Sequence, residues 1–167
     1  MQPDTRRQPT LLGSCALATT AAEARYRISY PEFTRRSSRV IALDDRAAAI
    51  VRGMAGQRWD GGHFLVFESA VPDDALLRCA DGGTALLSEE LDGADAVVMV
   101  ATADANAEAA SIIGDACAAR GIMSAGLVVP GAGPVGEVVS ALRPNAMVLV
   151  LLRNAADVPE VLSALRV

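Results

Sequence analysis

The chain has no lysine, because all 15 of its basic residues are arginine. This absence excludes a P-loop, whose lysine binds the phosphates, the strand lysine of protein kinases, and Schiff-base chemistry. The chain also has a single histidine, His63, which excludes a metal site built from several histidines. A Ser–His–Asp triad would have to use this one residue. Because His63 lies between Gly62 and an apolar segment, we interpret it as the entry of a strand.

Basic charge, aromatic residues and long apolar runs are also scarce. The net charge is −5 and the pI is about 4.8, so the basic surface of a sequence-independent nucleic-acid binder is missing. No apolar run reaches the roughly 18 residues of a membrane-spanning helix, which predicts no membrane partner. Cys15, Cys79 and Cys117 are odd in number and lack metal-ligand spacing, which favours inert thiols in a reducing, cytoplasmic setting. With 51% hydrophobic but only 4% aromatic residues, the core must consist of Ala, Val, Leu and Ile.

Composition divides the chain at about residue 38. Residues 1–38 are polar and rich in Arg, Thr and Ser, and we interpret them as a flexible N-terminal arm. Residues 39–167 alternate between apolar strands and helices, which predicts one α/β domain. The segment between the second strand and the second helix, with turns at residues 72–74 and 81–83, is expected to be looser.

The alternation predicts five strands and five helices. Apolar runs such as 96–101 and 125–129 are typical of parallel strands covered on both faces. We therefore expect a three-layer Rossmann-like sandwich with a mostly parallel five-stranded sheet, in the order 3-2-1-4-5 or 2-1-3-4-5. The strands are expected at 39–43, 64–68, 96–101, 125–129 and 147–152. The helices are expected from 44 or 45 to about 54 and at 84–91, 104–120, 135–142 and 158–165, the third capped by Asp104 and ended by Gly121.

Ligands of such sheets bind beyond the carboxyl ends of the strands. Gly131, Gly133 and Gly136 form a G-x-G-x-x-G pattern there, between a strand and a helix. Arg153 follows the next strand and would suit a 2′-phosphate better than a ribose hydroxyl. The short helix that follows and the late position in the sheet favour an ordinary loop instead. If the pattern binds a nucleotide or dinucleotide, Thr102 and Asn106 would contact its polar groups.

Asp44 and Asp45 follow the first expected strand, where receiver domains of response regulators hold a metal with an acidic pair. Asp104 could stand for the phosphorylated aspartate of a receiver, but the required lysine is absent. An acidic helix cap and first turn explain Asp44 and Asp45 by stabilisation of the helix dipole alone.

The segment GADAVVMVATA at 93–103, together with 109–113 and 119–123, resembles the nucleotide-binding domain of the FtsZ/tubulin family. The hydrophobic pattern extends this resemblance over about 120 residues. The family's glycine-rich phosphate loop is replaced here by Asp-Ala-Asn-Ala-Glu at 104–108, and its first glycine loop by Asp-Asp-Arg at 44–46. Carboxylates at an anion site repel phosphate. The resemblance therefore implies a degenerate relative without GTP hydrolysis.

We therefore expect a non-catalytic Rossmann-like domain that acts through protein association, as a homo-oligomer or with a protein partner. The alternative is a nucleotide- or dinucleotide-binding protein, or an enzyme, that uses the loop at residues 131–136. The apolar stripe of the last helix, formed by Val158, Val161, Leu162 and Leu165, is expected to pack on the sheet, with a subunit contact as the alternative.

Overall fold

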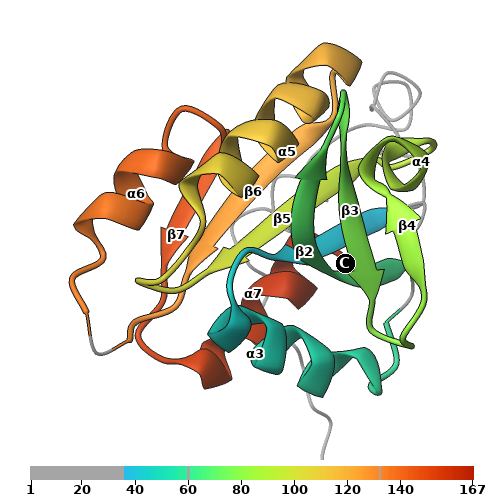
Figure 1. Cartoon of the computed structure of the whole chain (residues 1–167). Helices are drawn as coiled ribbons and strands as arrows, with labels where there is room; N and C mark the ends of the chain where they lie inside the picture. Colours follow the sequence, from blue (N-terminus) through green and yellow to red (C-terminus); the bar gives the residue numbers. More distant parts are fainter. Residues whose placement is uncertain (1–35, 60, 132) are drawn as a thin grey trace, which may run out of the picture. The chain divides into compact units, whose positions relative to one another are not determined.

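The computed structural model describes residues 36–59, 61–131 and 133–167, and all of them fall in one compact unit, Arg35–Val167. Residues 1–35 of the predicted N-terminal arm lie outside the described residues. Figure 1 shows the sheet with helices packed against it. The α/β class is confirmed.

A seven-stranded sheet forms the centre, in the order β4-β3-β2-β1-β5-β6-β7. Five of the strands are parallel and correspond to the five expected from sequence: β1 (Ser38–Ala42), β2 (Gly62–Val71), β5 (Ala96–Ala101), β6 (Met123–Val128) and β7 (Val148–Leu151). Among these five, the order is the second of the two alternatives, 2-1-3-4-5. Strand β7 is one edge of the sheet and β4 is the other.

The predicted count of five strands is wrong, because the segment expected to be loose forms two antiparallel strands. Strand β3 (Asp74–Cys79) folds back on β2 through a turn in which Asp73 has a φ of 61°. Strand β4 (Thr84–Leu86) then pairs with β3. The helix expected at 84–91 is consequently reduced to α4 (Leu87–Leu91). Buried Ala75 and Leu77 attach this extension to the core.

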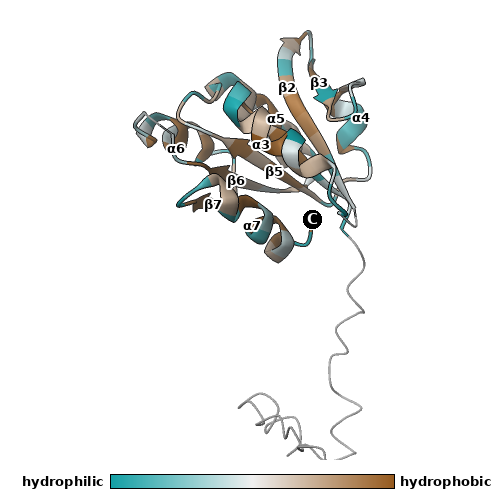
Figure 2. Cartoon of the chain, turned by 90° about the horizontal axis from the view of Figure 1, so that it is seen from below, coloured by the Kyte–Doolittle hydropathy of each residue, from teal (hydrophilic) through white to brown (hydrophobic). Residues whose placement is uncertain are grey.

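Helices cover both faces of the sheet, and each face has its own hydrophobic cluster. Helices α4, α5 (Ala107–Arg120) and α6 (Gly136–Leu142) contribute to one cluster. Helices α3 (Asp45–Ala55) and α7 (Val158–Leu165), the latter preceded by the 3₁₀ turn η1 (Ala155–Asp157), contribute to the other. Figure 2 shows the strands between these helices, coloured by hydropathy.

The apolar stripe of α7 packs on the sheet, as predicted. Val158 and Leu162 are completely buried, and Val161 and Leu165 pack against the same cluster. This stripe is therefore part of the core and is not free to contact another subunit.

Helix α5 begins later than predicted, because Asn106 is its N-cap and not Asp104. The Asn106 side chain accepts hydrogen bonds from the backbone amides of Glu108 and Ala109, at 2.9 and 3.3 Å. The helix ends at Gly121, as predicted, with a φ of 67° that glycine adopts without strain.

Candidate functional site

The carboxyl ends of β1 and β5 form the point at which the chain order of the sheet reverses. From β1 the sheet continues to β2 on one side and to β5 on the other. Ligands of open α/β sheets bind in the crevice at such a switch point. A hollow of about 520 Å³ lies here, lined by residues that follow β1 and β5 and by residues within β2: Leu43, Asp44, Asp45, Arg46, Val66, Phe67, Glu68, Asp104 and Asn106.

The Asp44 carboxylate joins the two loops at the switch point. Its Oδ1 accepts a hydrogen bond from the Ala47 amide at 2.8 Å, which caps helix α3. Its Oδ2 accepts from the Thr102 amide at 2.7 Å, and the Thr102 hydroxyl donates to Oδ1 at 3.0 Å. An anion bound at a helix N-terminus would use amides of this kind. The chain's own carboxylate therefore occupies donors that a phosphate would need.

The charges around the hollow are mainly negative. Besides Asp44, it is lined by Asp45, Glu68 and Asp104, and Arg46 is the only cation among the lining residues. The Arg46 Nε lies 3.8 Å from Asp104 Oδ2, and both side chains are more than half exposed. Such a pair is weak, since water screens it. The described residues contain no group of three or more His, Cys, Asp or Glu side chains placed to hold a metal ion.

Two residues predicted to contact a ligand, Thr102 and Asn106, make hydrogen bonds within the chain. Thr102 is buried, and its amide and hydroxyl both bind Asp44. The Asn106 side-chain oxygen caps α5. Both residues are at the switch point, as their sequence positions indicate, but these hydrogen-bonding groups are already used.

The three glycines predicted to bind a cofactor lie in the loop between β6 and α6. A Cβ atom added at Gly131 would be 3.2 Å from Arg46 Nη1, and one at Gly133 would be 3.3 Å from the Cβ of Ala103. The loop thus reaches the switch point. A Cβ at Gly136 would meet no atom within 4 Å, although the third glycine of a dinucleotide motif serves close packing of helix on strand. Helix α6 has only 7 residues, and no side chain caps its first turn.

Arg153, the last of the predicted ligand contacts, is exposed and follows β7. Strand β6 separates β7 from β5, so Arg153 is further from the switch point than the glycine loop. The structure therefore brings Thr102, Asn106, Gly131 and Gly133 to one region and leaves Gly136 and Arg153 at its margin.

A buried charged pair near the start of β1 was not predicted. Arg39 is only 6% exposed, and its Nε is 2.8 Å from Glu90 Oε2. The same Glu90 oxygen lies 3.2 Å from Nδ1 of His63, which stands opposite Arg39 in the β1–β2 register. His63 is the second residue of β2, which confirms its interpretation as a strand-entry residue. The sequence signal that could have indicated this buried pair is an arginine at the start of an apolar strand.

The described cysteines are poor nucleophiles. Burial raises the pKa of the Cys117 thiol to about 11, with Arg120 opposing the shift weakly. Burial also raises the pKa of Cys79, and the nearby carboxylates of Glu90 and Asp81 raise it further. Since the thiolate is the reactive form, neither cysteine is activated. These pKa directions agree with the prediction of inert thiols for Cys79 and Cys117, and Cys15 lies outside the described residues.

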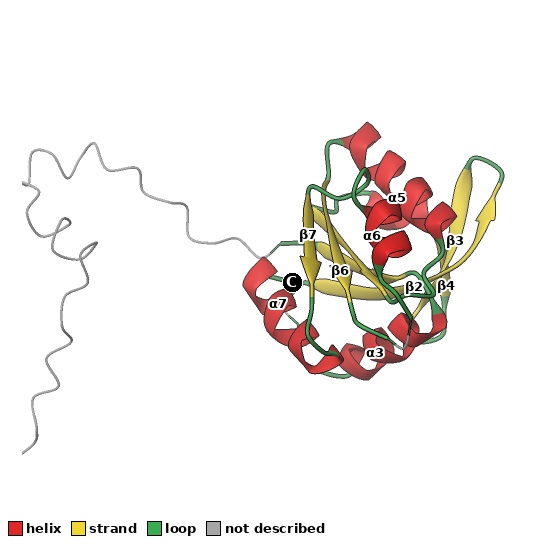
Figure 3. Ribbon diagram, turned by 90° about the vertical axis from the view of Figure 1, so that its left-hand side faces the viewer, coloured by secondary structure: helices red, strands yellow, loops and turns green. Residues whose placement is uncertain are grey.

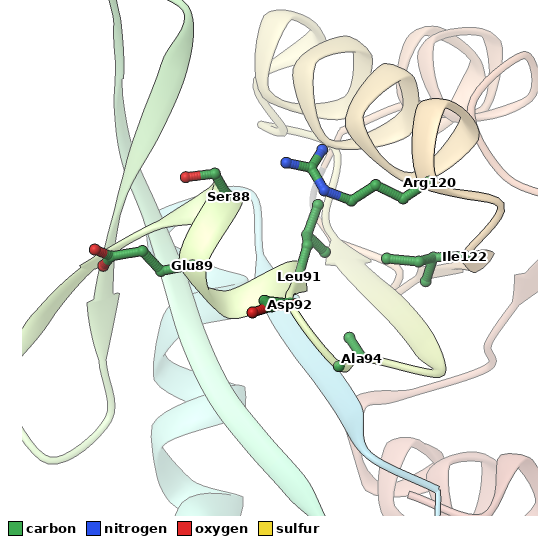
Figure 4. A pocket seen from close by; sticks show the side chains of 8 residues that line it. Ser88, Glu89, Leu91, Asp92, Ala94, Arg120 and Ile122 are labelled. Carbon is green, nitrogen blue, oxygen red and sulfur yellow. The ribbon is translucent and has the colours of Figure 1, made fainter.

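A second hollow of about 590 Å³ lies between α4 and the end of α5 (Figure 4). Glu89, Asp92 and Arg120 line it, together with Ser88. The Ser88 hydroxyl donates to Asp74, and an Arg120 Nη1–H donates to the carbonyl of Ala116 at 3.2 Å. Charges of both signs line this hollow, and its serine is already bonded, so it presents no convergent set of free groups.

No family model, curated protein or solved structure matches this chain. The resemblance to the FtsZ/tubulin family accordingly stays a prediction. None of the helices in the described part of the chain is long and apolar enough to span a membrane.

Proposed function

We propose that this chain is a non-catalytic Rossmann-like domain, a degenerate relative of the FtsZ/tubulin nucleotide-binding domain, that acts through protein association. The observation that carries the proposal is the open apolar edge of the sheet at β7. The hydrogen bonds of Asp44 and the acidic residues around it at the switch point support the non-catalytic part of the proposal. The two features are independent, because they involve different strands and different residues.

Strand β7 leaves large apolar side chains in water. Met147, which precedes the strand, is 76% exposed, Leu151 is 56% exposed and Val148 is 43% exposed. These are three of the five large hydrophobic residues that are exposed in the described chain. An exposed apolar edge strand is a template for pairing with another chain, and proteins usually protect it with charge or proline. Met147 through Leu152 contain neither.

The switch point supports the absence of nucleotide chemistry. A phosphate entering there would have to displace Asp44 from the amides of Ala47 and Thr102. It would also meet the carboxylates of Asp45 and Asp104. Two like charges 4 Å apart cost about 1 to 4 kcal/mol over effective dielectric constants of 80 to 20. That cost removes most of the affinity of a weak site.

A ligand panel tests the non-catalytic part. Thermal unfolding of the full chain would be followed with GTP, GDP, ATP, NAD⁺, NADP⁺ and FAD, with and without Mg²⁺. A ligand at 100 times its Kd adds about 2.7 kcal/mol to the stability, which is several degrees in Tm for a domain of this size. We expect no such shift and no turnover. A shift of several degrees with one nucleotide, or its steady hydrolysis or reduction, would refute the proposal.

Nucleotide binding by the glycine loop is the second candidate, and one observation favours it. A Cβ atom added at Gly131 would be 3.2 Å from Arg46 Nη1, so a cation and a glycine of this loop meet near the switch point. In this case Gly133→Val would abolish any shift found in the panel, because its Cβ would press on Ala103. Gly136→Ala is the matched control, since its added methyl meets no neighbour. Equal shifts in both variants would remove this candidate.

A further inference from the structure

We draw no further inference here: the strongest candidate, the open apolar edge of the sheet at β7 (Figure 3), already carries the proposed association, and nothing in the structure shows what covers it.

Discussion

Replacing Asp44 by alanine should destabilise the fold far more than replacing its neighbour Asp45. Asp44 is the only side chain that caps α3, and it also joins the loop after β1 to the loop after β5. Asp45 is exposed and lies in the first turn of the same helix. The pair therefore separates a tertiary hydrogen-bond network from the helix-dipole effect of an acid.

The magnitude follows from the bonds that are lost. Loss of an N-cap side chain costs about 1 kcal/mol. The Thr102 amide is buried and donates to a charged acceptor, and loss of such a bond costs about 1.5 to 3 kcal/mol. Because the bonds share one carboxylate, we expect a total of about 3 kcal/mol for Asp44→Ala. Asp45→Ala should cost about 0.5 kcal/mol or less.

Urea unfolding followed by circular dichroism provides the measurement, with both variants compared at neutral pH. Each kcal/mol corresponds to about 4 °C in Tm for a domain of this size, so thermal scans should show a loss of about 12 °C for Asp44→Ala. Asp44→Asn keeps an acceptor for the Ala47 amide but cannot accept at both positions, and it should fall between the two alanine variants. If Asp44→Ala matches Asp45→Ala to within about 0.5 kcal/mol, the network does not stabilise the fold.

Three further predictions concern packing, pH and ligands. Gly114→Ala should destabilise the fold by about 1 to 3 kcal/mol, because its added Cβ would be 2.5 Å from the Cβ of Asn145. Gly53→Ala meets no neighbour within 4 Å and should stabilise α3 by about 0.5 to 1 kcal/mol. Urea unfolding of both variants would contradict this if their free energies of unfolding changed in the same direction. Burial raises the pKa of Asp74, but hydrogen bonds from Ser88 and two backbone amides outweigh burial and hold it below 3.8. The Asp74 carboxylate therefore contributes stability above its unfolded-state pKa, and this contribution is lost as the pH falls through its folded-state pKa. Asp74→Asn should reduce the loss of stability below about pH 4 in a curve of unfolding free energy against pH. An unchanged loss would exclude a contribution of Asp74 to acid sensitivity. The nucleotide panel should give Tm values within about 1 °C of the ligand-free protein, and one clear shift would refute the proposed function.

The strands were predictable where burial dictates their composition. Ala96–Ala101 is completely apolar and buried along its whole length, as expected for a central parallel strand. Strand β3 was missed because it is covered on one face only. Its buried residues alternate with more exposed ones, and the turn before it was recognised without its pairing. In such short segments, strand pairing is decided by contacts with β2 that the local sequence does not specify.

The sequence predicted where the residues of the switch point lie, but not which hydrogen bonds they make. Asp44 was expected to cap a helix, and it does so. Its bonds to Thr102, 58 residues later, depend on β1 and β5 being neighbours. That adjacency is a property of the strand order, which the sequence left open between two alternatives. The cap of α5 was placed two residues early because Asp104 and Asn106 are both good capping residues, and only the backbone path decides between them.

The location of unsatisfied groups distinguishes the two functions considered for this chain. A binding site for a small anion needs donors without partners, and at the switch point the amides of Ala47 and Thr102 already have one in Asp44. A site for another protein needs exposed apolar surface and backbone groups that can still pair, and β7 offers both. Leaving six apolar residues along an open edge risks aggregation unless a specific partner covers them. A protein partner that pairs with β7 would remove that risk, because it would close the open edge.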